Sequence, residues 1–320
     1  MYSAKEGVSL LSASKYPDGK NKDVWFLQFY APNSAARDSK EKFVALSQSL
    51  AKTGVKVGAV SCDSEPALCR RVLGTVSPRM RPMYVVVAAG EDFVYQDEDG
   101  QGSSPSPKRL HEFVVASIPT EVHNLRLATQ LEIFSSVQCA DKRKAAYGVG
   151  VILLTAKFET SLFIKSLSHS LRDKAAVAEV RGSNNQLAKE LGLGNQPAYP
   201  ILVVLCSGSD KLASLRYDGD LKEWDKARRW IDDKFGRGRA EGTCRQLRSK
   251  SGEARKKRQQ RAEGAKRLSV ADLRKKRVGE LIDMCEDLGV PSAGLVEKAD
   301  YVNAIAAKLG LGLGGGKSEL

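Results

Sequence analysis

The fold of the first third of the chain is decided by the stretch Val24-Trp25-Phe26-Leu27-Gln28-Phe29-Tyr30-Ala31-Pro32. Residues 24–30 are apolar or aromatic apart from Gln28, which is typical of a central strand buried on both faces of a sheet. The segment 34–52 follows with Phe43, Leu46 and Leu50 at helical spacing, so it predicts an amphipathic helix. Strand and helix together begin an α/β unit.

The elements expected along the rest of residues 8–118 continue this alternation. Strands are predicted at Val55–Val60, Met83–Ala88 and Phe93–Gln96, and a closing helix at Leu110–Ser117. A βαβ unit followed by a hairpin and a helix is the order of elements in the thioredoxin fold.

The stretch Trp25–Pro32 also resembles the strand that leads into the active site of protein disulfide isomerase domains. In that family the next residues are Trp-Cys-Gly-His-Cys-Lys, whereas here they are Asn33, Ser34, Ala35, Ala36, Arg37 and Asp38. Thiol–disulfide exchange needs one thiol that attacks and a second that resolves the mixed disulfide. Ser34 and Arg37, at the degenerate CxxC positions, supply neither, so we expect no catalytic residue and no redox enzyme activity.

The same resemblance implies roles for one proline and two cysteines. Pro82 fits the family's cis-proline, which faces the active site and exposes backbone to an extended substrate; the alternative is a plain loop proline. Cys62 and Cys69 match a structural disulfide that several family domains carry. Two small buried thiols in a reducing compartment are the alternative.

A second copy of the pattern begins near Thr120. Tyr199-Pro200 leads into a strand at Ile201–Leu205 as Arg81-Pro82 leads into Met83–Val87. The further elements predicted are helices at Glu132–Lys144, Thr160–Leu171, Asn185–Leu191 and Leu221–Phe235 and strands at Val149–Thr155, Ala176–Val180 and Leu212–Tyr217.

This copy resembles the non-catalytic b-type domains of the isomerase family. Ala156-Lys157-Phe158-Glu159 stands where CxxC would be, and Cys139 and Cys206 are expected to be core thiols. Relatives with such tandem platforms hold unfolded clients or partner chaperones, so Pro82 and Pro200 are the candidates for client binding.

The positive charge of the chain is concentrated in one segment. Of a net charge of +13, residues 237–277 contribute +12, from 16 Lys and Arg and 4 acidic residues. Residues 237–268 are expected to form a basic linker, either a solvated helix or disordered, because they carry few large apolar side chains. Arg255-Lys256-Lys257-Arg258 is either part of a spacer or a nucleic-acid contact. The absence of Phe, Tyr and Trp in residues 236–277 argues against base stacking.

Residues 269–310 predict a small helical module. One expected apolar face contains Leu273, Val278, Leu281, Ile282, Cys285 and Leu288, and the facing helix contains Tyr301, Val302, Ile305 and Leu309. The stretches 271–281 and 297–305 resemble the SAP-like domain of the mesencephalic astrocyte-derived neurotrophic factor family. The family's CxxC is replaced by Ser292, Ala293, Gly294 and Leu295. The resemblance implies the lumenal heat-shock chaperone as a partner, although SAP-type helix pairs are also DNA-binding modules.

The chain ends in Lys317-Ser318-Glu319-Leu320, a variant of the KDEL-type retention signal, on a Gly-rich tail at 311–320. This ending predicts the endoplasmic reticulum lumen. Met1–Gly7 lacks the apolar stretch of a signal peptide, which conflicts with a lumenal address. Either the chain is a mature or truncated product, from which an upstream J-domain is one segment that could have been lost, or the KSEL ending carries no signal. No apolar run is long enough to span a membrane.

The cysteine and histidine pattern gives no cofactor. Six cysteines and three histidines contain no CxxC pair and no metal-ligand spacing, so neither a metal nor another cofactor is expected. An active oxidoreductase would require Cys244 or Cys285 to work with glutathione, and Cys244 lies among basic residues that favour its thiolate.

The fold class predicted is α/β, with two tandem thioredoxin-like domains at 1–119 and 120–236. The basic linker 237–268, the SAP-like helical domain 269–310 and the tail 311–320 follow. The function predicted is a non-catalytic, protein disulfide isomerase-like chaperone or adaptor in endoplasmic-reticulum protein folding, which binds unfolded or nascent clients. The alternative is a nucleic-acid-binding protein that uses the basic segment and the SAP-like domain.

Overall fold

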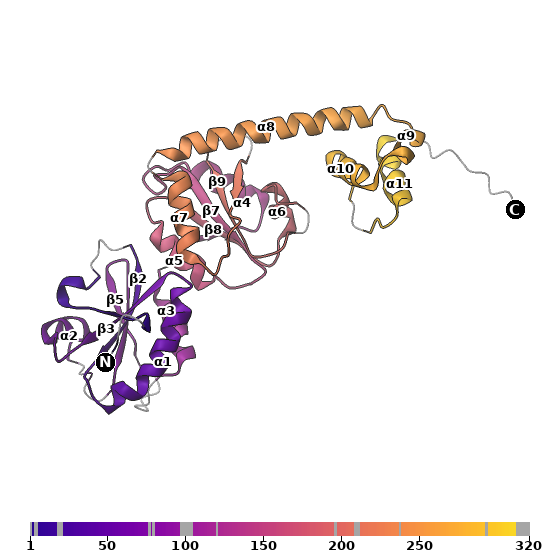
Figure 1. Ribbon diagram of the computed structural model, residues 1–320. Helices are drawn as coiled ribbons and strands as arrows, with labels where there is room; N and C mark the ends of the chain where they lie inside the picture. The colour runs from indigo at the N-terminus through magenta and orange to yellow at the C-terminus, as the bar shows by residue number, and fades with distance from the viewer. Residues whose placement is uncertain are drawn as a thin grey trace. The chain divides into compact units, whose positions relative to one another are not determined.

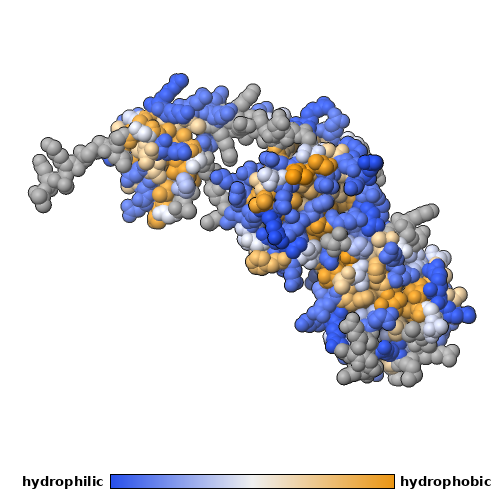
Figure 2. All heavy atoms as spheres, turned by 180° about the vertical axis from the view of Figure 1, so that it is seen from behind, coloured by the Kyte–Doolittle hydropathy of each residue, from blue (hydrophilic) through white to orange (hydrophobic). Residues whose placement is uncertain are grey.

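The computed structural model describes residues 2, 6–17, 22–75, 78, 81–96, 105–119, 121–194, 197–207, 212–236, 238–291 and 294–311. For residues 34, 250–252, 254–258 and 286 the description covers the backbone only. The chain divides into two compact units, Met1–Arg245 and Gln246–Leu320. Figure 1 shows the elements of both units, and Figure 2 shows the heavy atoms from behind, coloured by the hydropathy of each residue.

The first unit begins with a five-stranded mixed sheet in the order β1-β3-β2-β4-β5. Strands β1 (Ser9–Leu10), β3 (Val55–Ser61) and β2 (Val24–Tyr30) are parallel, whereas β4 (Met83–Ala88) and β5 (Glu91–Val94) form an antiparallel hairpin at the other edge. Helices α1 (Ser34–Ala51), α2 (Pro66–Leu73) and α3 (Pro107–Ser117) cover the sheet, and a short 3-10 helix spans Ala13–Lys15.

The central strand β2 is buried on both faces because its alternate residues enter two separate cores. Phe26 packs with α1 and α3, whereas Leu27 and Phe29 pack with α2. Gln28 is fully buried and accepts a hydrogen bond from the Tyr2 hydroxyl, while its amide nitrogen donates to Ser39 Oγ at 3.2 Å. A buried polar group with partners carries little desolvation cost, so Gln28 is tolerated there.

A second five-stranded sheet repeats the same topology in the order β10-β9-β7-β8-β6. Here β6 (Val122–Asn124), β8 (Ala176–Val180) and β7 (Val149–Leu154) are parallel, and β9 (Ile201–Cys206) and β10 (Ser214–Arg216) are antiparallel. One face packs against α4 (Ala128–Ile133) and α6 (Asn185–Glu190). The other face is covered by α5 (Leu162–Ser170) and α7 (Trp224–Phe235) (Figure 1). The first unit is therefore α/β, with two sheets that are consistent with two thioredoxin-like domains.

Helix α5 of the second domain is also in contact with the first domain. Leu162 is 5% exposed and belongs to the apolar core built on β2. The Ser166 hydroxyl donates to the carbonyl oxygen of Thr53, and Lys165 Nζ donates to the carbonyl of Val115 at 2.7 Å. The burial of this ammonium group lowers the pKa of Lys165. The two sheets therefore share one helix at their junction.

The long helix α8 (Arg239–Ala265) follows, and its two ends belong to different units. In the first unit, Ala240 and Cys244 are buried, and Thr243 Oγ1 donates to the carbonyl of Lys234 at 2.9 Å. In the second unit, Ala265 joins the core formed by α9 (Val270–Lys275), α10 (Val278–Leu288) and α11 (Lys298–Leu309). This core contains Leu273, Leu281, Cys285, Val302 and Ile305.

Several predicted elements differ from those observed. Strands β1 and β6 were not expected, because two- and three-residue edge strands carry no periodic pattern. The helix expected at 132–144 starts earlier as α4 and continues as a π-helix at Phe134–Gln138. The residues expected on one apolar face, from Leu273 to Leu288, lie on two helices, α9 and α10, and Val278, which was placed on that face, is 41% exposed.

Candidate functional site

The first candidate position is the amino end of α1 in the first domain, where the family resemblance places CxxC. Asn33 caps this helix, since its Oδ1 accepts a hydrogen bond from the Ala36 amide at 2.9 Å. Ser34 starts the helix, although its side chain lies outside the described part, and Arg37 is exposed on the first turn. The described side chains here form a helix cap, and the sequence supplies no thiol.

The prediction of a cis-proline is wrong for Pro82. The Arg81–Pro82 peptide bond is trans and the proline is buried in the first domain. The trans form is the default for X–Pro bonds, and a buried ring offers no surface to a client. In the second domain the Tyr199–Pro200 bond is cis and Pro200 is exposed.

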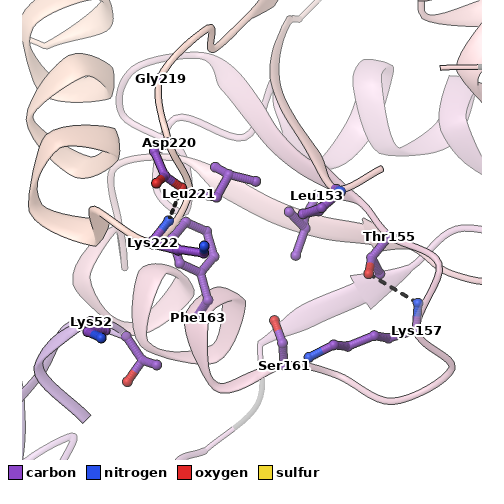
Figure 3. A pocket seen from close by; sticks show the side chains of 12 residues that line it. Lys52, Leu153, Thr155, Lys157, Ser161, Phe163, Gly219, Asp220, Leu221 and Lys222 are labelled. Carbon is purple, nitrogen blue, oxygen red and sulfur yellow. Dashed lines mark hydrogen bonds between the residues drawn. The ribbon is translucent and has the colours of Figure 1, made fainter. Parts of the chain in front are cut away.

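A cavity of about 480 Å³ lies beside Pro200 (Figure 3). Its apolar wall comes from Leu153 on β7, Phe163 on α5 and Leu221 before α7, together with the proline itself. Leu153 is buried, and Phe163 and Leu221 are half-buried. Ligand pockets are commonly apolar hollows of this size that carry a few polar groups.

Polar groups surround this apolar wall. The lining includes Thr155, Ser161, Asp220 and three lysines, which are Lys52, Lys157 and Lys222. Thr155 Oγ1 accepts a hydrogen bond from the Lys157 amide at 3.2 Å, and Asp220 Oδ1 accepts from the Lys222 amide at 2.8 Å (Figure 3). Both contacts fix the backbone of the loops that border the cavity.

Residues 156–159, at the second degenerate CxxC position, form a loop whose backbone is fixed by hydrogen bonds from Arg181 and Gly182. The Phe158 carbonyl accepts from Arg181 Nη1 at 3.0 Å, and the Lys157 carbonyl accepts from the Gly182 amide at 3.3 Å. Arg181 is paired in turn with Glu179, a fully buried carboxylate on β8 that also accepts from Thr160 Oγ1 at 2.5 Å. The Phe158 side chain on this anchored loop is 81% exposed.

The first domain completes the cavity with Lys52 and Thr53, which follow α1. The next residue, Gly54, has a φ of +80° and lies against the indole of Trp224 on α7. A Cβ atom at Gly54 would be 2.2 Å from Trp224 Cε2, so the two domains approach without room for a side chain. Of the residues that line this cavity, only Pro200 was predicted from the sequence as a binding residue. Lys52 and Thr53 were not, because no periodic pattern reports contacts between domains.

Four of the six cysteines are paired. The Cys62–Cys69 disulfide, which the family resemblance implies, is present, and a second disulfide joins Cys206 to Cys244. The expectation of a lone core thiol at Cys206 is therefore wrong, and Cys244 is not a free thiol that could work with glutathione. Both residues are buried, Cys206 at the end of β9 and Cys244 on α8, and the sequence alone gives no sign of their proximity.

The two remaining cysteines are free and buried. Burial raises the pKa of the Cys139 thiol to about 12 and also raises the pKa of Cys285. A thiol attacks as its thiolate, so this environment suppresses reactivity at ordinary pH. The role considered for Cys285 as a catalytic thiol therefore finds no support in its surroundings.

Some predicted sites lie outside the described residues. These are the ending Lys317-Ser318-Glu319-Leu320, the side chains of Arg255, Lys256, Lys257 and Arg258, and the positions Ser292 and Ala293. Among the residues that are described, no cluster of metal-ligating side chains occurs. No helix within the described ranges has the length and apolar character needed to cross a membrane.

Comparisons with known proteins show similarity over part of this chain. No protein-family model matches the chain. It is 25% identical over 198 residues to a Dictyostelium discoideum protein named "Putative protein disulfide-isomerase", with 62% of this chain and 44% of that protein aligned. The chain therefore spans less than half of this curated relative.

The similar solved structures include ERdj5 and human ERp44. A crystal structure of ERdj5 matches at 18% identity with a TM-score of 0.48, over 72% of this chain and 29% of that one. A crystal structure of human ERp44 matches at 17% identity with a TM-score of 0.31, over 73% of this chain and 57% of that one. The chain is therefore similar to a protein disulfide isomerase over 198 residues, and both of its sheets have the same strand order.

Proposed function

We propose that this protein is a non-catalytic, protein disulfide isomerase-like chaperone or adaptor that binds unfolded segments of other proteins in the cavity beside Pro200. The observation that carries the proposal is the combination of this cavity with a loop, residues 156–159, that contains no thiol. A site that has a cavity but no cysteine thiol can bind an extended client chain, but it cannot exchange the disulfides of that client.

The anchoring of the loop supports a binding role. Phe158 exposes a large apolar ring on a backbone fixed by Arg181, so little backbone entropy of the loop is lost when the ring contacts a client. Rigid aromatic side chains are common anchors in protein interfaces. The Pro200 cavity and the Phe158 ring together would hold apolar side chains of an unfolded segment.

The compartment and the second unit belong to the same proposal. The KSEL ending supports residence in the endoplasmic reticulum lumen. The helices α9–α11 would act as the SAP-like module that recruits the lumenal heat-shock chaperone. In this arrangement the first unit binds the client and the second brings the partner.

A second candidate function, nucleic-acid binding, is favoured by one observation. Helix α8 is continuous over 27 residues, and its sequence holds nine Lys and Arg against three acidic residues. A helix of net charge +6 would neutralise phosphates and bind DNA with a steep dependence on salt. Salt-dependent DNA binding that disappears when α8 is replaced by a neutral helix would favour this function over the first.

The test of the chaperone proposal is the suppression of client aggregation by the whole chain. Light scattering of chemically unfolded insulin B chain should fall in its presence, and insulin reduction should stay at background. Phe158→Ser removes an exposed ring and should weaken suppression several-fold, since such anchors contribute about 1–2 kcal/mol.

Ile133→Ser is the matched control. Ile133 is 57% exposed on α4, which covers the opposite face of the second sheet. Equal losses in both variants would assign the effect to general surface hydrophobicity and contradict a site at Pro200. Insulin reduction well above background would overturn the non-catalytic part.

A further inference from the structure

The three lysines that line the Pro200 cavity have no acidic partner among the described residues. Within the described residues, Lys52, Lys157 and Lys222 form no salt bridge. Other ammonium groups of this unit are paired with carboxylates, as in Lys22–Asp173, Lys40–Glu6, Lys56–Asp23 and Lys174–Asp232. The cavity therefore carries three cationic groups that the protein itself does not neutralise.

Among the described residues, Asp220 is the only carboxylate that lines this cavity, and one negative charge does not balance three positive ones. Asp220 Oδ1 accepts a hydrogen bond from the backbone amide of Lys222, so this carboxylate stabilises the conformation of the loop. Three positive charges and one negative charge leave a net charge of +2 at the rim. A hollow whose rim has one sign of charge raises the local concentration of ligands with the opposite sign.

The apolar wall restricts the class of ligand further. Leu153, Phe163 and Leu221 line the same cavity as the lysines, and Figure 3 shows the Phe163 ring directed toward Leu221 and Lys222. A small inorganic anion or a phosphate backbone has no apolar group that could contact these three side chains. A peptide that carries an apolar side chain between acidic ones would satisfy both the wall and the rim.

We infer that the Pro200 cavity selects unfolded segments in which an apolar residue is flanked by Asp or Glu. The inference rests on the proposed function, because it names the substrate class of the same client site. The apolar side chain would enter between Leu153, Phe163 and Leu221. The flanking carboxylates would pair with Lys157 and Lys222 from the second domain and Lys52 from the first.

The first experiment compares three synthetic peptides that share one central Leu-Phe-Leu segment. The flanks are glutamate, glutamine or lysine, a neutral dye is attached at one end, and fluorescence anisotropy measures the Kd for the full chain. Because an exposed ion pair contributes a factor of about 1.5 to 5, three of them should make the glutamate peptide bind about tenfold more tightly than the glutamine peptide. The difference should shrink at 1 M salt, where the Debye length falls to about 3 Å.

The second experiment assigns the preference to the rim. The variant Lys52→Gln/Lys157→Gln/Lys222→Gln should bind the glutamate and glutamine peptides about equally. The matched control, Lys42→Gln/Lys108→Gln/Lys189→Gln, removes the same charge from exposed positions that do not line the cavity, and it should keep the preference. All six lysines are exposed, so the folds of both variants, checked by circular dichroism, should be unchanged.

The outcomes separate the inference from the proposed function. If the glutamine and glutamate peptides bind wild type equally and Phe158→Ser weakens both, clients do bind but the acidic preference is overturned. If no peptide binds, the proposed function itself fails. If a single-stranded oligonucleotide displaces the glutamate peptide and itself binds more tightly, the cavity selects polyanions rather than peptides, which also overturns the inference.

Discussion

Cys206 at the end of β9 is covalently joined to Cys244 on α8, with their Cα atoms 5.7 Å apart. The two cysteines are 38 residues apart in sequence, and the closed loop contains β10 and all of α7. The first turns of α8 are therefore attached covalently to the second sheet, in addition to any side-chain packing between them.

Removal of this bond should destabilise the first unit more than removal of the other disulfide. On the chain-entropy model, closing 38 residues contributes about 4 kcal/mol, whereas the seven-residue loop of Cys62–Cys69 contributes about 2 kcal/mol. Urea unfolding of Cys206→Ala/Cys244→Ala and of Cys62→Ala/Cys69→Ala, followed by tryptophan fluorescence, measures both losses. Trp224 and Trp230 lie inside the longer loop and report on it directly. An equal loss in the two variants would contradict this ranking.

Gly54→Ala should loosen the junction between the two domains of the first unit. The new Cβ would overlap the Trp224 indole, so the helix α7 and the end of α1 would have to move apart. Gly74→Ala is the matched control, because Gly74 also has a positive φ, of +63°, but has open space around it. Both variants should lose about 1–2 kcal/mol from backbone strain.

The difference between the two variants reports on the Trp224 contact. Gly54→Ala should lose about 2 kcal/mol more than Gly74→Ala, since overpacking typically costs 1–3 kcal/mol. Its Trp224 emission should also shift to the red as the indole gains solvent. Identical urea midpoints and emission spectra would mean that the domains do not depend on this approach.

His169 makes the stability of the first unit depend on pH. The imidazole is buried beside the junction, Nε2 accepts a hydrogen bond from the Ala89 amide at 3.4 Å, and Arg172, Asp23 and Lys22 lie around it. Burial, with a smaller effect from Arg172, lowers the pKa of His169 from 6.5 to about 4. Between these two values the unfolded chain binds a proton that the folded chain does not, so stability falls as the pH falls.

The size of this effect can be measured by substitution. From pH 7.5 to pH 5.0, His169 alone should remove about 2 kcal/mol of the free energy of unfolding. The variant His169→Gln can still accept the Ala89 hydrogen bond but does not titrate, so it should lose about 2 kcal/mol less than wild type over this interval. Parallel pH profiles for the two proteins would show that His169 does not contribute.

Arg181 should be needed both for stability and for the client loop. Arg181→Ala leaves the fully buried Glu179 without its counter-charge, and its Oε2 already lacks a hydrogen-bond partner among the described residues. An uncompensated buried charge costs about 3–5 kcal/mol. The loop 156–159 would also lose the contact to the Phe158 carbonyl, so peptide affinity should fall.

The double variant Glu179→Gln/Arg181→Ala separates these two effects. Replacing the carboxylate with a neutral amide should recover most of the lost stability, whereas peptide affinity should stay low because the Phe158 carbonyl still lacks Arg181. Urea unfolding and fluorescence anisotropy measure the two quantities. A full recovery of affinity would assign the role in binding to Glu179 rather than to Arg181.

The two sheets could be predicted because their central strands are long and apolar. Residues 24–30 and 149–154 read as buried strands in the sequence and are β2 and β7 in the structure. The edge strands β1 and β6 depend on hydrogen bonds to β3 and β8 rather than on any pattern of their own. Local periodicity cannot report them.

The candidate site was predictable only where it lies close to one strand in sequence. Pro200 directly precedes β9, so the repeated order of elements indicated it, and the same order placed residues 156–159 at the degenerate CxxC position after β7. Lys52 lines the cavity because the first domain packs on the second. Cys206 lies beside Cys244 because the chain after α7 runs back past the end of β9. Both relationships depend on tertiary contacts, which sequence spacing does not encode.

The shared helix α5 sets a limit on how the protein can be dissected in the laboratory. A fragment that starts near residue 121 would turn Leu162 and Ser166 out to water, although both are now covered by the first domain. Such a fragment would tend to self-associate through the newly exposed face of α5. Its ligand affinity would then be measured on a surface that the intact protein does not have. Expression boundaries that keep residues 2–245 together avoid this artefact.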